Sequence, residues 1–337
     1  MPFELSASKI VPASFFGMPL GLIALGLAWR SAAAIWRVPP LIEECFVWGG
    51  SLLWLYLFVV YLAKWFWHRE AAEREFKDAV QCCFVGLAGV VALLASIGLA
   101  PQAPRLGFVL FLLGSVWTLV FAIYRTGSLW MGGRKPEATT PILYLPTVAG
   151  SFVFASAAVS MGHPDWGQIA FGTGVLAWLA IESVLIHRLY TAAEMSPALR
   201  PTLGIQLAPS CVAAVAYLNV TGGGPDLLVH GLVGYALLQA LILVRMGPWL
   251  WAAGPTPAWW AFSFGAAALP TAALKLLARG DSGAVGALAP WLFTIGNLVL
   301  AVLVIMTIVL LIRGRLLPLP IAAAPITAEL PSASATK

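Results

Sequence analysis

Two charged side chains interrupt apolar stretches, where a charge without a partner is unfavourable. Lys275 is the one charge in the stretch 258–278, and Glu182 is the one carboxylate well inside the stretch 167–190. A lysine beside a water-filled passage raises the local concentration of anions, and a carboxylate in a membrane is a candidate for proton transfer or buried hydrogen bonding. Neither the four histidines nor the four cysteines have metal-ligand spacing, and no phosphate-binding loop or nucleophile elbow is present. We therefore expect no enzyme, no metal and no cofactor.

The stretch WWAFSFGAAALP, Trp259–Pro270, weakens the backbone on both sides of a large aromatic ring. Phe264 lies between Ser263 and Gly265, and Pro270 follows within two turns. Glycine leaves room for a neighbouring backbone, and proline bends a helix. From these residues alone, ordinary packing of Phe264 is the leading interpretation. A ring that projects inward and closes a passage is the alternative.

An apolar composition decides the class of protein. Of the 337 residues, 61% are hydrophobic and 10% are charged, whereas soluble domains carry about 25% charged residues. Uncharged apolar runs recur along the chain, each near the roughly 20 residues that a membrane-spanning helix needs. We therefore expect an all-α integral membrane protein. The net charge of +5 does not indicate a nucleic-acid partner, because the basic residues lie in loops that flank the spans.

Ten membrane spans are expected, joined by short connections that make consecutive spans antiparallel and form five helical hairpins. They lie at approximately 10–29, 45–67, 79–99, 106–124, 142–161, 167–190, 203–220, 227–246, 258–278 and 286–312. We expect one ten-helix transmembrane domain over residues 10–315. A short segment 1–9 precedes it, and a tail 318–337 rich in Pro, Ala, Ser and Thr follows it and is expected to be disordered.

Lysine and arginine set the expected orientation, because cytoplasmic loops are enriched in both. Of the 19 basic residues, 14 fall on the side that holds both termini. The other side holds Arg30, Arg37, Arg105, Lys275 and Arg279. Both termini, with the segments 1–9 and 318–337, are therefore expected in the cytoplasm. The chain itself is expected in the inner (plasma) membrane of a bacterium.

Helix-breaking residues favour the odd-numbered spans. The first, fifth, seventh and ninth spans have interior prolines, and the third has glycines instead. In lipid, a carbonyl freed by proline must find a partner inside protein or in a wet cavity. We predict five inner helices enclosed by five outer ones; the alternative is that proline is simply frequent in membrane helices. The predicted kinks are at Gly17, Pro19, Gly86, Pro146, Pro209, Gly265 and Pro270.

Three stretches carry a resemblance to a known family: FFGMPLGLIALGLAWR (Phe15–Arg30), LPTVAGSFVFA (Leu145–Ala155) and WWAFSFGAAAL (Trp259–Leu269). Over about residues 10–315 the chain resembles the TehA family of tellurite-resistance proteins, plant slow anion channels and fungal malate transporters. The resemblance implies ten helices in five hairpins around a quasi-fivefold central pore. It also implies homotrimers with one pore per subunit. Phe264 matches the phenylalanine that plugs the pore in that family.

With this resemblance, Phe264 becomes the expected gate, since an apolar constriction can close a pore by excluding water. Lys275 follows after close to three helical turns, on the same face and roughly 16 Å further along. It is expected in the external vestibule, where it would attract anions; an interfacial lysine that reaches the headgroups is the alternative. Glu182 lies on an outer helix. We expect it to be paired or hydrogen-bonded there, with proton coupling as the alternative.

We predict a gated anion channel or channel-like exporter that passes small monovalent anions such as chloride or nitrate. Neutral polar walls without fixed binding charges suit selection by ease of dehydration. The rival prediction is a proton-coupled carrier of C4-dicarboxylates such as malate, or of sulfite. A membrane scaffold without transport is disfavoured by the alternation of proline. The expected partners are small inorganic or organic anions, the lipid bilayer and further copies of the chain in a homotrimer.

Overall fold

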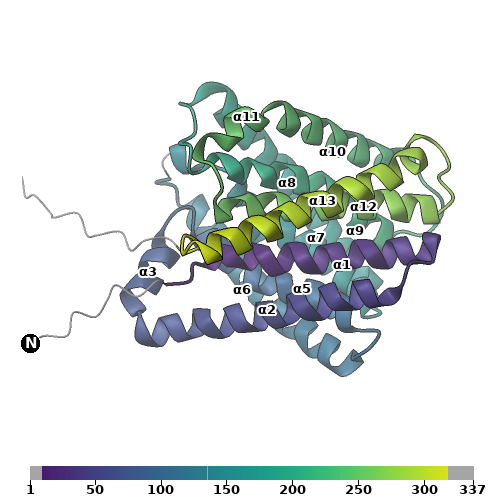
Figure 1. Cartoon of the computed structure of the whole chain (residues 1–337), viewed down its shortest axis with the longest axis horizontal. Coiled ribbons are helices and arrows are strands. Elements are labelled where there is room, and N and C mark those ends of the chain that lie inside the picture. The colour runs from purple at the N-terminus through teal and green to yellow at the C-terminus, as the bar shows by residue number, and fades with distance from the viewer. Residues whose placement is uncertain (1–9, 135, 318–337) are drawn as a thin grey trace, which may run out of the picture.

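The computed structural model describes residues 10–134 and 136–317, and within them the chain is helical and contains no strand (Figure 1). Ten segments of this part are long and apolar enough to cross a membrane, as predicted. The protein is therefore an all-α integral membrane protein. The expected N-terminal segment 1–9 and the tail 318–337 lie outside the described residues.

The even-numbered spans are continuous α-helices. They are α2 (Pro40–Trp67), α6 (Pro104–Trp130), α8 (Pro164–Thr191), α10 (Leu227–Arg245) and α13 (Ala284–Ile312). Two short helices, α3 (Arg69–Lys77) and α11 (Gly247–Leu250), lie in the connections.

The odd-numbered spans are composite. In four of them a short 3-10 or π-helical segment precedes the regular α-helix, and in the third span a break at Gly86 separates two α-helices. The five are η1–α1 (Ala13–Phe16, Gly17–Trp36), α4–α5 (Cys82–Val85, Leu87–Leu99), η3–η4–α7 (Pro141–Leu143, Leu145–Ala149, Gly150–Ser160), η5–α9 (Arg200–Leu207, Ala208–Val220) and η7–α12 (Pro257–Phe262, Ser263–Ala278). The segment η4 is a π-helix, and the other η segments are 3-10 helices.

The predicted kink residues lie at or near these junctions. The junctions and the turns beside them hold Gly17, Pro19, Gly86, Pro146 and Pro209, whereas α12 itself holds Gly265 and Pro270. A proline in the first turn of a helix is tolerated, because backbone N–H groups there have no acceptor within the helix. Pro270 is different, since it lies inside α12 and leaves a carbonyl without its helical donor.

Two spans extend well past their expected C-terminal ends. The first ends at Trp36 rather than 29, and the fourth ends at Trp130 rather than 124. Each continues past an arginine whose guanidinium donates to backbone carbonyls: Arg30 to the carbonyls of residues 97 and 98, and Arg125 to that of residue 79. A charge with such partners does not have to end a span at the membrane surface.

Burial separates the two sets of spans. In the odd-numbered spans, 56–89% of the most apolar window is buried in the protein; in the even-numbered spans only 17–33% is. The exposed side chains of the even-numbered helices are largely apolar, as in Leu52, Leu113, Leu176, Leu241 and Val302, and suit contact with lipid tails.

The odd-numbered spans contact one another in a closed order. Their α-helices touch in the sequence α1, α5, α7, α9, α12 and back to α1. Each even-numbered helix packs against the odd-numbered helix before it and also touches the next one, so α2, for example, contacts both α1 and α5. In Figure 1 the long helices run side by side along the horizontal axis.

Outer helices pack against backbone carbonyls at and near the helix breaks. Near the Gly86 junction, the indole N–H of Trp117 donates to the Val85 carbonyl (3.0 Å) and that of Trp54 donates to the Ala88 carbonyl (2.8 Å). Pro270 leaves the Ala266 carbonyl without its usual donor. Gly296 of α13 lies against that carbonyl so closely that a Cβ there would be 2.5 Å from the oxygen.

Gly296→Ala should therefore lower stability. The added methyl group would meet a backbone oxygen at 2.5 Å and the Pro270 ring at 3.2 Å. Forcing such overpacking costs about 1–3 kcal/mol. The measurement is the thermal unfolding midpoint of the purified protein in detergent.

The matched control is Gly49→Ala in α2, where an added Cβ has no heavy atom of the described residues within 4 Å. Alanine is the better helix former at an exposed position, so this variant should melt at or above the wild-type temperature. Equal melting of the two variants would contradict close packing of α13 on the Pro270 bend.

Candidate functional site

A cavity of about 560 Å³ opens toward one face of the protein. The first and the last residues that the structure describes both lie at this face (Figure 1). We call this face the terminal face and this space the terminal cavity; Pro12 and Arg315 line it near the two ends. All five odd-numbered spans contribute to its wall, for example through Leu20, Leu87, Val148, Ala208 and Phe264.

A second cavity of about 290 Å³, the distal cavity, lies toward the opposite ends of the same spans. Its wall again includes all five odd-numbered spans, for example through Leu27, Leu94, Val153, Val215 and Ala268. Phe264 and Val212 line both cavities, and no other described residue does so. These two side chains therefore lie between the two spaces.

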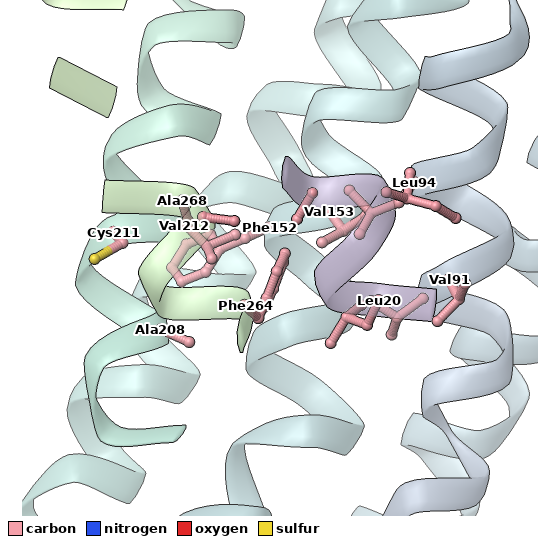
Figure 2. Close-up of a cluster of buried hydrophobic side chains, with 14 of the residues drawn as sticks. Leu20, Val91, Leu94, Phe152, Val153, Ala208, Cys211, Val212, Phe264 and Ala268 are labelled. Atoms are coloured by element: carbon pink, nitrogen blue, oxygen red, sulfur yellow. The ribbon is translucent and has the colours of Figure 1, made fainter. Parts of the chain in front are cut away.

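The layer around Phe264 is apolar. Figure 2 shows its ring among aliphatic and aromatic side chains from the other odd-numbered spans, including Leu20, Val91, Phe152 and Val212. Phe264 is only 7% exposed. The layer consequently separates the two cavities with side chains that offer no hydrogen bond to water.

The neighbours of Phe264 explain why its ring points inward. The Ser263 hydroxyl lies 2.7 Å from the Trp260 carbonyl and 3.3 Å from the Gly17 carbonyl of the first span. On the other side, a Cβ at Gly265 would be 2.7 Å from the Leu207 side chain of the seventh span. Since the residues before and after Phe264 face the two adjacent spans, Phe264 faces the space between them.

Phe262 has a different environment from Phe264. Its ring packs on Trp259, with 5.3 Å between the ring centroids, and against Gly204, where an added Cβ would be 2.4 Å from it. Phe262 lines neither cavity. Two residues that are two positions apart point to different faces of a helix, and the structure places Phe264 on the face that lines the cavities.

Lys275 lines the distal cavity, on the same wall as Phe264. Sequence reasoning missed a second cation there, because Arg30 was expected at a span end. Its Nε donates to Glu43 at 2.6 Å, and its two terminal nitrogens donate to the Ile97 and Gly98 carbonyls at 2.9 and 2.6 Å. Glu43, an acidic residue at the start of the next span, is the signal that could have predicted a paired Arg30 between the first two spans.

An ion pair lies at the mouth of the terminal cavity, and it too was not predicted. Lys64 donates to Glu75 at 2.7 Å, with both side chains less than 10% exposed. The other carboxylate oxygen of Glu75 accepts the backbone N–H of Ala13 at 2.8 Å. Glu75 thereby ties α3 to the beginning of the first span, and Arg315 adds a positive charge to the same wall.

Glu182 lies behind the wall of the terminal cavity and accepts hydrogen bonds from four residues on four successive spans. One carboxylate oxygen accepts from Gln206 (2.8 Å) and Tyr235 (2.5 Å). The other accepts from Trp178 (2.9 Å) and Tyr144. Of these donors Tyr144 lines the terminal cavity. None of the ion pairs found within residues 10–134 and 136–317 involves Glu182.

Comparisons with known proteins agree with this architecture. A family model described as voltage-dependent anion channel, SLAC1, matches residues 11–312. The tellurite resistance protein TehA homolog of Haemophilus influenzae is 33% identical over 306 residues, which cover 90% of this chain and 92% of that protein.

Two plant proteins of Arabidopsis thaliana are also similar. The S-type anion channel SLAH2 is 24% identical over 280 residues, covering 78% of this chain and 52% of the relative. The S-type anion channel SLAH3 is 26% identical over 223 residues, covering 63% of this chain and 34% of the relative. The family match over nearly all of the described residues, together with the TehA homolog, shows that this chain belongs to the SLAC1 family of voltage-dependent anion channels.

Proposed function

We propose that the chain is a gated anion channel, or a channel-like exporter, whose pore passes through the terminal and distal cavities and is closed between them by Phe264. The observation that supports this most strongly is the position of Phe264, which lines both cavities within an apolar layer. Narrow apolar constrictions close pores because water and ions lose their hydrogen-bonding partners there.

The proposed architecture is five helical hairpins around this pore, with the odd-numbered spans inside and the even-numbered spans outside. The closed order of contacts among α1, α5, α7, α9 and α12 supports the inner group. The low burial of the even-numbered spans supports an outer group in contact with lipid. We also propose that three such chains form a homotrimer. The trimer would lie in a bacterial inner membrane, with both termini of each chain in the cytoplasm.

Charges along the path favour anions, since each mouth has a cation that lines its cavity. Lys275 lines the distal cavity and Arg315 the terminal one, and positive charge at a pore mouth concentrates anions. The remaining wall is mostly apolar and offers few hydrogen bonds. Ions that shed water easily cross such a layer at the lowest energy, so we propose chloride and nitrate as the conducted anions. Two relatives carry the name S-type anion channel, which agrees with this choice.

The residues Gly17, Pro19, Gly86, Pro146, Pro209, Gly265 and Pro270 are proposed to shape the inner helices, and Gly265 to admit Leu207 beside the gate. Glu182 is proposed as a structural anchor rather than a proton carrier. Its two oxygens already accept four hydrogen bonds, and these contacts tie four successive spans together.

Phe264→Ala should open the path. Removing the ring joins the two cavities, so anion current through planar bilayers or oocyte membranes should rise at least roughly tenfold over the wild type, as expected for loss of an apolar constriction. The measurement is chloride and nitrate current at equal surface expression, with reversal potentials that follow the anion gradient.

Phe262→Ala is the matched control, because it removes an equal ring two residues away that lines neither cavity. It should leave current at the wild-type level. If both variants stay silent at normal expression, the gate is wrong. Saturable malate or sulfite uptake that needs a proton gradient would then favour the rival carrier.

Glu182→Gln should preserve folding, whereas Glu182→Leu should not. The glutamine amide can still accept from Trp178, and the Gln206 amide can turn so that its own unpaired oxygen accepts the new N–H. Leucine accepts no hydrogen bond, so several buried donors lose their acceptor at a cost of about 1–3 kcal/mol each. The melting temperature of the Glu182→Leu variant should therefore fall sharply. The measurement is thermal unfolding in detergent.

The same glutamine variant in a Phe264→Ala background tests proton coupling. A structural anchor predicts unchanged anion current at pH 6 and pH 8. Loss of transport, or loss of its pH dependence, in a protein that melts like the wild type would instead make Glu182 a proton carrier.

A further inference from the structure

We propose that the distal cavity contains a binding site for one monovalent anion, formed by Lys275 with Ser156 and Asn219. This proposal rests on the proposed function, because the site would lie on the anion path, but it concerns binding and can be tested without current. The three residues belong to α12, α7 and α9, and all three line the same cavity.

Lys275 supplies the charge of this site. Its ammonium group makes no hydrogen bond or ion pair with any residue in the described parts of the chain. Arg30, the other cation in the cavity wall, is paired with Glu43 and bound to two backbone carbonyls. The positive charge that remains uncompensated in this cavity is consequently a single one, at Lys275.

Ser156 and Asn219 supply neutral donors. Three other hydroxyl groups in the wall, those of Ser31, Ser160 and Thr271, donate to carbonyls of their own helices at 3.1, 2.8 and 2.7 Å. For Ser156 and Asn219, in contrast, no side-chain partner exists among the residues that the structure describes. Both side chains line the cavity, so these donors remain available to a ligand inside it.

The ligand class follows from charge and surroundings. Most of the remaining wall is apolar, including Leu94, Ile97, Val153 and Val215. An anion with one charge is neutralised by Lys275 and receives further hydrogen bonds from the amide and the hydroxyl. A dianion such as an ionised dicarboxylate would keep a second charge unpaired in apolar surroundings, which is strongly unfavourable. Halides and nitrate are therefore the expected occupants, held on the distal side of Phe264.

The test measures anion binding to the purified full-length protein in detergent. Bromide is titrated into a gluconate buffer at constant ionic strength, and the melting temperature is followed. A ligand that binds the folded state alone raises this temperature in a saturable way. Crystals soaked in sodium bromide then locate the ion by its anomalous scattering. The wild type should show saturable stabilisation and a bromide peak beside Lys275.

Three variants separate the site from general effects of charge. Lys275→Met keeps the length of the side chain and should raise the half-saturating bromide concentration roughly tenfold or more, the equivalent of one lost charge-assisted contact. Ser156→Ala with Asn219→Ala should raise it by a smaller factor. Arg105→Gln removes a charge from an exposed position outside the cavity and should leave binding unchanged. In gluconate alone, Lys275→Met should melt no lower than the wild type, because it removes an unpaired charge.

The outcomes distinguish this site from the channel proposal. Wild-type protein without saturable stabilisation and without a bromide peak in the distal cavity overturns the site, whatever the currents show. Binding that survives Lys275→Met equally overturns it. Saturable bromide binding at Lys275 in a protein whose Phe264→Ala variant carries no current supports the site and contradicts the proposed pore.

Discussion

Lipid offers no hydrogen bond to a backbone carbonyl, and this constraint accounts for the division between the two sets of helices. The even-numbered spans, which are exposed, are unbroken α-helices. The odd-numbered spans contain breaks, where neighbouring helices cover the freed carbonyls: the Trp117 indole donates a hydrogen bond to the Val85 carbonyl, and Gly296 shields the Ala266 carbonyl by close packing. A broken helix is stable here because protein surrounds it.

Charges within the spans follow the same rule. Lys64 is paired with Glu75, Arg30 with Glu43, and Glu182 accepts four hydrogen bonds. Each group has partners on at least one other helix, so these contacts also join neighbouring helices. Lys275 differs from these three groups, because it faces a cavity instead of a partner. A charge in that position suits an ion path, where it can attract an anion.

The sequence was sufficient for the number of spans and for the separation of odd from even, because both depend on local composition and on proline. The sequence did not predict side-chain positions that depend on contacts with residues far away in the chain. Arg30 was taken to end the first span, since its acceptors lie some 70 residues away in α5. The inward direction of Phe264 depends on contacts of Ser263 with the first span and of Gly265 with the seventh. Such contacts leave no periodic pattern in the chain.

The same contacts limit how the proposed gate can move. Ser263 is held against the first span, and further along α12 the Pro270 bend packs on Gly296 of α13. Displacing the whole helix would break both contacts. Rotation of the Phe264 side chain would break neither contact, because the ring takes part in neither of them. The ring borders a cavity on each side. The anchored helix therefore favours opening of the proposed gate by rotation of the ring over displacement of α12.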